Sequence, residues 1–202
     1  MPVFFVPPRC LTPPTVSITG SLLTHLRDSL RIETGQTILL SDGENLRYRT
    51  RVTEITKHAL TGRILDVVAR PPQQVPSLLL GQALLKGERM DWVIQKTTEL
   101  GVRMIIPIQS GRSIVQLKAD RIEAQRARWQ RIALEAAQQS EQWQVPAIAS
   151  PLPFPSRTPD LCAYTRVLIL TERRDEVRSL SSISLPTSSE TSILVLVGPE
   201  GG

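Results

Sequence analysis

Two loops, each directly after an apolar run, carry the residues best suited to chemistry. Thr171-Glu172 follows the run VLIL, and Gly198-Pro199-Glu200-Gly201-Gly202 follows ILVLV. Glycines let the backbone approach a flat ligand without a Cβ in the way, and they leave amide groups free to bond it. A carboxylate such as Glu172 or Glu200 can accept hydrogen bonds from ribose hydroxyls. An ordinary surface turn is the alternative for the glycine-rich segment.

Other kinds of site find little support. The chain has neither the G-x-x-x-x-G-K-[ST] phosphate loop nor the G-x-G-x-x-G dinucleotide motif. His25 and His58 have no Cys or His at ligand spacing, so no metal site is expected. Cys10 and Cys162 lie far apart and are expected to be reduced structural thiols.

The chain shows no membrane or export signal. No stretch approaches the roughly 18 apolar residues that a membrane span needs. The N-terminus, MPVFFVPPRC, lacks the basic region and apolar run of a signal peptide. We therefore expect a cytoplasmic protein without a membrane partner.

The basic residues are unevenly distributed. Residues 1–75 hold nine Lys/Arg against six Asp/Glu, and residues 76–150 hold ten against seven, which gives +3 in each stretch. The remainder holds five against six, or −1, within a total of +5. A basic excess of this size suits a polyanionic partner, although a mixed surface explains it equally well.

The elements that would carry these loops begin with a strand-rich region. Short β-branched or aliphatic runs predict strands over 3–6, 37–41, 46–55 and 60–69, and the apolar spacing over 22–32 predicts one helix ending near Gly35. Asp42-Gly43 favours a hairpin turn over 41–45. Several short strands with one helix predict a small barrel, and the proline-rich segment 71–76 predicts a linker.

The remainder alternates strand and helix. Apolar runs predict buried strands over 78–85, 104–108, 167–171 and 193–197. Helical spacing runs from Met90 to Leu100 with Gly101 as the cap, and again over 118–141 with Trp129 on the apolar face. This order predicts an open, parallel α/β sheet, whose ligand lies beyond the carboxyl ends of its strands.

Several blocks of residues then occur in a recognisable order. The blocks are Lys86 with Gln95-Lys96-x-x-Glu99-Leu100-Gly101-Val102, Pro107-x-x-Ser110-x-Arg112-Ser113, Trp129-x-x-Ile132 with Glu135-Ala136-Ala137-x-Gln139-Ser140, Val145-Pro146, and VGPEGG at 197–202. His25-Leu26, Leu30-Arg31 and Gly35 precede them near the N-terminus. In this order, the blocks resemble the RsmE-type 16S rRNA (uracil-N3) methyltransferases.

The resemblance implies a fold and an activity. It implies a PUA-like, RNA-binding β-barrel over 1–71 and a SPOUT-type α/β methyltransferase domain with a trefoil knot over 76–202. The implied reaction is the S-adenosylmethionine-dependent methylation of N3 of a uracil in 16S rRNA of the small ribosomal subunit, carried out by a homodimer without a metal. Family members continue beyond the position of Gly202, so the domain is expected to be incomplete here. A chain that truly ends at Gly202 is expected to bind the cofactor barely or not at all and to methylate nothing.

The resemblance also assigns roles. Arg112 is the expected catalytic cation, which would stabilise the uracil anion, and it would also contact RNA with His25 and Arg31; a structural ion pair is the alternative for Arg112. Gln142 stands where the family has an arginine, which puts that contact in doubt. The implied cofactor-binding residues are Leu170, Thr171, Glu172, Val197, Gly198, Pro199, Glu200, Gly201 and Gly202.

Two further readings stay open. In the first, the chain is a non-catalytic RNA-binding protein with the α/β part as a scaffold. In the second, it is a SPOUT methyltransferase that acts on another RNA position. Lys96 and Glu99, close together on the predicted helix, could simply pair.

Overall fold

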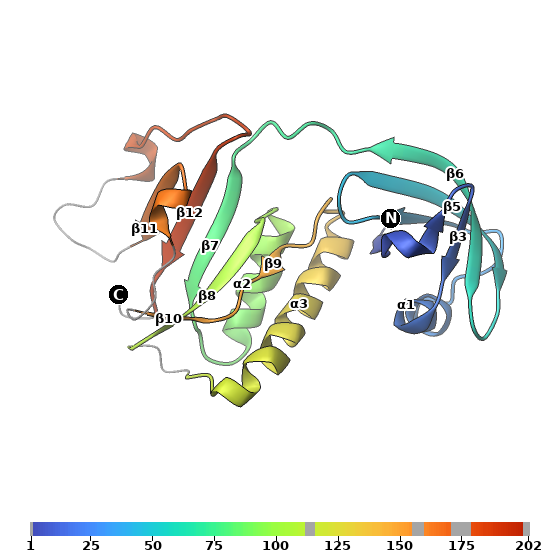
Figure 1. Cartoon of the computed structure of the whole chain (residues 1–202), viewed down its shortest axis with the longest axis horizontal. Coiled ribbons are helices and arrows are strands. Elements are labelled where there is room, and N and C mark those ends of the chain that lie inside the picture. Colours follow the sequence, from blue (N-terminus) through green and yellow to red (C-terminus); the bar gives the residue numbers. More distant parts are fainter. Residues whose placement is uncertain (1, 112–115, 155–159, 171–178, 200–202) are drawn as a thin grey trace. The chain divides into compact units, whose positions relative to one another are not determined.

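The fold is taken from a computed structural model, which describes residues 2–111, 116–154, 160–170 and 179–199. Contacts divide the chain into two compact units (Figure 1). The first unit contains Met1–Pro71 and Ala137–Gln144, and the second contains Pro72–Ala136 and Val145–Gly202.

The first unit is built on a six-stranded sheet in the order β1-β4-β5-β6-β3-β2. Only the β1–β4 pair is parallel in this sheet. The two end strands, β1 and β2, do not pair with each other, so the predicted barrel is an open one. Its elements are β1 (Val3–Phe5), η1 (Pro8–Cys10), β2 (Leu11–Thr12), β3 (Thr15–Ile18), α1 (Gly20–Thr24), η2 (His25–Ser29), β4 (Thr37–Ser41), β5 (Leu46–Ile55) and β6 (Leu60–Ala69).

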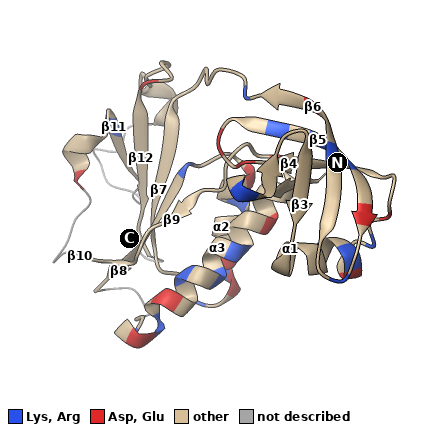
Figure 2. Cartoon of the chain, turned by 45° about the vertical axis from the view of Figure 1, so that its right-hand side comes forward, with Lys and Arg blue, Asp and Glu red and all other residues tan. Residues whose placement is uncertain are grey.

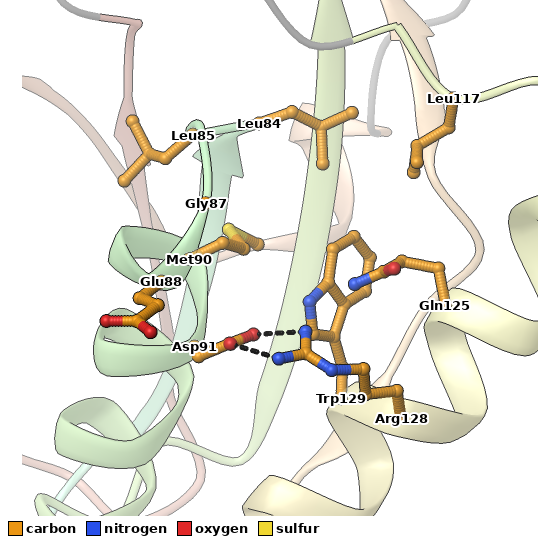
Figure 3. Close-up of a pocket in the computed structure, with 10 residues that line it drawn as sticks. All are labelled: Leu84, Leu85, Gly87, Glu88, Met90, Asp91, Leu117, Gln125, Arg128 and Trp129. Carbon is orange, nitrogen blue, oxygen red and sulfur yellow. Dashed lines mark hydrogen bonds and ion pairs between the residues drawn. The ribbon is translucent and has the colours of Figure 1, made fainter.

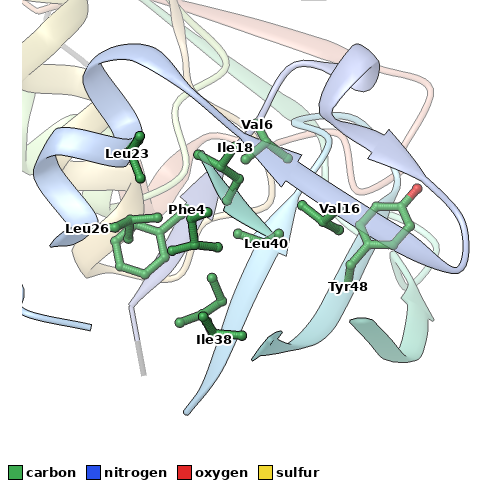
Figure 4. Close-up of a cluster of buried hydrophobic side chains, with 11 residues drawn as sticks. Phe4, Val6, Val16, Ile18, Leu23, Leu26, Ile38, Leu40 and Tyr48 are labelled. Carbon is green, nitrogen blue, oxygen red and sulfur yellow. The ribbon is translucent and has the colours of Figure 1, made fainter. Parts of the chain in front are cut away.

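Alternation along the long strand β5 supplies part of the core of this unit. In β5, Tyr48, Thr50 and Val52 are buried while the residues between them are arginines. The buried side chains join those of β1, β3, β4 and the α1–η2 segment in one cluster, which Figure 4 shows around Phe4 and Leu40. The predicted turn is confirmed, since Gly43 has a φ of 79° and Asp42 Oδ1 accepts hydrogen bonds from three following backbone amides.

The predicted helix over 22–32 is wrong at its end. Helix α1 stops at Thr24 and continues as the π-turn η2, in which the Leu30 amide donates to the His25 carbonyl at 3.0 Å. Arg31 then adopts a left-handed φ of 52°, which ends the helical path four residues before Gly35. The short strands β2 and β3 were not predicted.

The second unit is an open parallel sheet in the order β10-β8-β7-β12-β11, with β9 pairing β8, as the strand–helix alternation predicts. The helices labelled α2 and α3 lie beside each other in Figure 1. Its elements are β7 (Ser77–Ala83), α2 (Glu88–Glu99), β8 (Met104–Ser110), η3 (Ala119–Arg121), α3 (Ile122–Gln139), β9 (Ala147–Ile148), β10 (Leu152–Phe154), η4 (Leu161–Ala163), β11 (Arg166–Leu170), η5 (Leu180–Ser182) and β12 (Ser192–Val197).

Side-chain burial in this unit follows the predicted faces at many positions, but Leu78, Leu100 and strand β11 are exceptions. Trp129, Met90 and Ile94 belong to the main cluster between the helices and the sheet. Leu100 is 78% exposed, because α2 ends at Glu99 and the chain turns at Gly101, where φ is 82°. Strand β11 is not buried as predicted, because it is the edge strand of the sheet and Ile169 is 63% exposed.

The cysteines also differ in environment. Cys10 and Cys162 are both free, and Cys10 packs against the core of the first unit. Cys162 is exposed, so it is not the structural thiol that the sequence predicted.

Candidate functional site

The carboxyl ends of three neighbouring strands meet at one edge of the second unit's sheet. Leu170 of β11 is the register partner of Val197 of β12, and Val197 is in turn the partner of Gln82 of β7. Leu170 and Val197, which directly precede the two predicted cofactor loops, therefore lie side by side. Ligands of open α/β sheets bind at this edge, so the two strand ends lie where the sequence leads us to expect a ligand.

The described residues at this edge present apolar and glycine surface. Leu170 is 55% exposed, Gly198 is exposed, and Val197 and Pro199 are partly buried. An exposed leucine at the end of β11 and a residue without a side chain directly after β12 leave apolar surface and open backbone at this edge. Six predicted site residues, Arg112, Thr171, Glu172, Glu200, Gly201 and Gly202, lie outside the described residues.

Gln82 is a polar residue at this edge that sequence reasoning missed. Its side chain is only 5% exposed, and its Nε2 donates to the carbonyl of Ala83 at 3.1 Å. A glutamine inside the apolar run LLLGQALL was the available signal, because amide side chains are seldom buried without a role. Its position beside Val197 makes Gln82 a further candidate for contact with a ligand held by the loops.

A pocket of about 300 Å³ opens directly after β7, between α2 and α3. Figure 3 shows an apolar side formed with Leu84, Leu85 and Met90, and charged groups at Asp91 and Arg128. Leu84 follows β7 directly, so the pocket begins one strand away from the candidate cofactor loops. The full lining is Leu84, Leu85, Gly87, Glu88, Met90, Asp91, Leu117, Gln125, Arg128 and Trp129.

Two interactions define the polar wall of this pocket. Arg128 Nη1 donates to Asp91 Oδ1 at 2.7 Å and Nη2 donates to Oδ2, so the pair is bidentate and links α3 to α2. The hydrogen bond to Asp91 raises the pKa of Arg128 above its ordinary value. Beside this pair, the indole Nε1 of the buried Trp129 has no hydrogen-bond partner among the residues that the structure describes.

The predicted RNA-binding residues of the described chain lie in the first unit. His25 and Arg31 are both exposed, at the two ends of the segment that contains the π-turn. The His25 ring stands edge-on to Phe4, with 6.5 Å between ring centroids. Arg31 follows the turn in the left-handed conformation, which a residue other than glycine rarely adopts. The structure thus brings the two onto one short segment.

Three other basic side chains of the second unit bind neighbouring protein groups. Lys96 Nζ donates to both carboxylate oxygens of Glu99, at 3.0 and 2.8 Å, which lowers the pKa of Glu99. The plain pairing of these two residues is therefore confirmed. On α3, Arg126 donates to the carbonyl of Ile148 at 2.8 Å. Together with the bidentate Arg128, this ties two arginines of α3 to neighbouring elements.

The described part of the chain lacks two features, a membrane-spanning helix and a metal-binding cluster. None of its helices combines the length and the apolar character that crossing a membrane requires. No three His, Cys, Asp or Glu side chains come together there in a way that could hold a metal ion.

Family models match both units. A model described as "RNA methyltransferase domain" matches residues 71–202, and one described as "RNA methyltransferase PUA domain" matches residues 18–65. The first match covers more than half of the chain and includes the whole sheet edge with both candidate loops. The second lies within the curled sheet of the first unit.

Similar proteins agree with these matches. The chain is 29% identical to "Ribosomal RNA small subunit methyltransferase E" of Bacillus subtilis, over 94% of this chain and 75% of that protein. It is 28% identical to the protein of the same name from Synechocystis, over 98% of this chain and 63% of that protein.

Among solved structures, the Neisseria gonorrhoeae protein of that name, determined bound to S-adenosyl methionine, is 30% identical. It superimposes with a TM-score of 0.83 over 100% of this chain and 81% of its own. On these matches, the chain belongs to the RNA methyltransferase family whose members combine this α/β domain with a PUA domain.

Proposed function

We propose that the protein transfers a methyl group from S-adenosylmethionine to N3 of a uracil in small-subunit ribosomal RNA, as a homodimer. The observation that carries the proposal is the likeness to the Neisseria gonorrhoeae enzyme solved with S-adenosyl methionine, which extends over the whole chain. The curated relatives carry the same small-subunit rRNA methyltransferase name. The sheet edge where Leu170 and Val197 lie side by side supports the proposal from the structure itself.

The described residues suit this cofactor. Leu170 and Val197 offer apolar surface for the adenine ring, and Gly198 offers backbone amides that no side chain covers. We assign cofactor contacts to these residues, to Pro199, and to Thr171, Glu172, Glu200, Gly201 and Gly202 outside the described ranges. When bound, S-adenosylmethionine supplies an electrophilic methyl group, so the protein's own residues have to orient the base and manage its proton.

The proton on N3 sets the chemical task. A neutral uracil is a poor nucleophile near neutral pH, so the site has to remove that proton or stabilise the developing anion. A positioned base or cation contributes roughly 10²–10⁴-fold in rate to such a step. We assign the anion-stabilising cation to Arg112, which follows β8 by two residues in the sequence and lies outside the described residues.

The position of the methyl group is the direct test. The protein is incubated with S-adenosylmethionine and unmethylated small-subunit rRNA, and the RNA is digested to nucleosides for mass spectrometry. We expect 3-methyluridine as the new product. A methyl group on ribose or on another base would refute N3 specificity while keeping the enzyme class. No incorporation into any RNA, together with retained RNA binding, would favour a non-catalytic RNA-binding protein.

A second test separates the functions of the two units. Arg31→Ala removes an exposed cation but leaves the backbone cost of the left-handed conformation in place, because alanine resists it as arginine does. We expect weaker rRNA binding, with the slope of log affinity against log salt reduced by about 0.7 for one lost phosphate contact. The affinity for S-adenosylmethionine should stay unchanged in calorimetry. Equal losses in both measurements would contradict the division of labour between the units.

A further inference from the structure

The outer face of the β5–β6 hairpin carries a row of arginines that the proposed function leaves unused. Alternation along β5 turns Tyr48, Thr50 and Val52 into the core. The intervening residues Arg47, Arg49 and Arg51 consequently face the other side, and they account for blue segments of β5 in Figure 2. On the adjoining strand, Arg63 is exposed as well.

Strand register places two of these arginines directly opposite each other. Arg51 of β5 is the Cα partner of Arg63 of β6. The row continues to Thr37 of β4 on one side and to Thr15 of β3 on the other. Neighbouring strands lie about 5 Å apart, so the two guanidinium groups leave the sheet as close neighbours, flanked by threonines.

Local partners compensate only some of the charge on this face. Arg49 Nη2 lies 3.8 Å from Asp66 Oδ2, and Arg47 Nη2 donates to the Glu141 carbonyl at 2.6 Å. Arg51 and Arg63 form no ion pair or hydrogen bond with the residues that the structure describes. Glu54, at the bulge beyond Arg51, forms no ion pair with either arginine.

An uncompensated pair of this kind opposes folding. Like charges directly opposite each other across two strands destabilise a sheet. Both side chains are exposed, so packing does not require arginine at either position. A bound anion between the two guanidinium groups would convert their repulsion into attraction, and arginine matches phosphate in a bidentate geometry.

We propose that Arg51 and Arg63 bind the phosphate backbone of the RNA substrate, which makes the outer face of β5–β6 an RNA-docking surface. This inference rests on the proposed function, in that RNA is the substrate. Phosphate contacts come mainly from arginine, lysine and hydroxyl side chains, and they position a nucleic acid without reading its bases. The row Thr37, Arg51, Arg63 and Thr15 has this composition.

The test is the salt dependence of RNA binding by the Arg51→Gln/Arg63→Gln variant. Fluorescence anisotropy measures the affinity of the protein for a labelled single-stranded oligouridylate between low and high salt. Loss of two single-strand phosphate contacts should reduce the slope of log affinity against log salt by about 1.4, from 0.7 per contact. If the wild type and the variant have equal RNA affinities at 1 M salt, the variant binds RNA about 25-fold more weakly than the wild type at 0.1 M salt.

Matched variants separate a specific contact from a general change in charge. Arg9→Gln/Arg166→Gln removes the same net charge from two exposed positions outside this face, and it should change the slope by much less. Arg51→Lys/Arg63→Lys should retain most of the slope. Oligocytidylate should lose as much affinity as oligouridylate, because phosphate contacts do not distinguish bases. The urea midpoint of the glutamine variant should equal or exceed that of the wild type, because a repulsion is removed.

The outcomes are distinguishable from a failure of the proposed function. If the wild type methylates rRNA and binds RNA but the glutamine variant keeps the wild-type slope, the docking surface is refuted while the enzyme assignment stands. An equal loss in the Arg9/Arg166 control refutes it too, because charge alone would then explain the effect. A wild type that binds no RNA at any salt concentration overturns both proposals.

Discussion

Replacing Trp129 by alanine should lower the free energy of unfolding of the second unit by about 3–5 kcal/mol, the usual cost of removing a buried aromatic side chain. Trp129 is only 3% exposed and packs between α2, α3 and the sheet with Met90, Ile94 and Ile105. The neighbouring pocket of about 300 Å³ would merge with the space that the indole leaves, so collapse of the site could recover little. Urea denaturation followed by circular dichroism measures the effect.

The matched variant is Trp129→Phe, which keeps an aromatic ring at the position. It removes the Nε1 donor that has no partner in the described structure (Figure 3). An unpaired buried donor opposes folding, so its loss offsets part of the lost ring area. We expect a cost within about 1.5 kcal/mol, the range of shape-conserving apolar exchanges. Equal costs for alanine and phenylalanine would mean that the indole N–H has a partner that stabilises it.

Gly81→Val should impair both the stability of the second unit and its binding of S-adenosylmethionine. Gly81 lies in the central strand β7, where a Cβ would collide with Leu196 Cδ2 and stand 3.1 Å from Ile108 Cδ1. Overpacking of this kind typically costs about 1–3 kcal/mol. Leu196 is its register partner and directly precedes Val197 and the candidate cofactor loop, so the displacement reaches the site. Each 1.4 kcal/mol of packing strain that reaches the cofactor site weakens the binding of S-adenosylmethionine about tenfold.

A second glycine provides the control for that experiment. An added Cβ at Gly111 would meet no atom within 4 Å, and Gly111 is exposed. Gly111→Ala should therefore leave the urea midpoint unchanged, whereas Gly81→Val should lower it. Calorimetry then measures the affinity of the Gly81 variant for S-adenosylmethionine. Wild-type affinity in a destabilised Gly81→Val protein would show that the loop after Val197 is independent of the packing beneath it.

Sequence patterns predicted the fold best where one periodicity runs over many residues. The bounds of β4, β5 and β6 agree with prediction, and in β5 the side chains from Tyr48 to Thr53 alternate between core and solvent. The strands β2, β3, β9 and β10 span two to four residues each, too few for a pattern to stand out. The helix end at Thr24 was missed because the π-turn depends on packing of Leu26 against the core.

The candidate site, too, could be predicted only in part from the sequence. Apolar runs followed by polar or glycine residues predicted two candidate ligand loops, but the runs contain no information on strand order. Only the register of β11, β12 and β7 shows that Leu170, Val197 and Gln82 lie in one line. Likewise, the sequence shows three alternating arginines in β5, whereas the apposition of Arg51 and Arg63 depends on the register shift between Val52 and Glu54.

The position of β12 in the sheet also sets the order in which this chain can assemble. β12 is the last strand that the structure describes, yet it lies between β7 and β11. On a ribosome, the β4–β6 meander of the first unit can pair as soon as it emerges, because its contacts are local. β7 has to wait for a partner more than a hundred residues later, and the backbone amides and carbonyls along that edge stay unpaired meanwhile. Non-local pairing of this kind is slow and exposes strands to aggregation. The β4–β6 meander can therefore be folded while the second unit is still being synthesised.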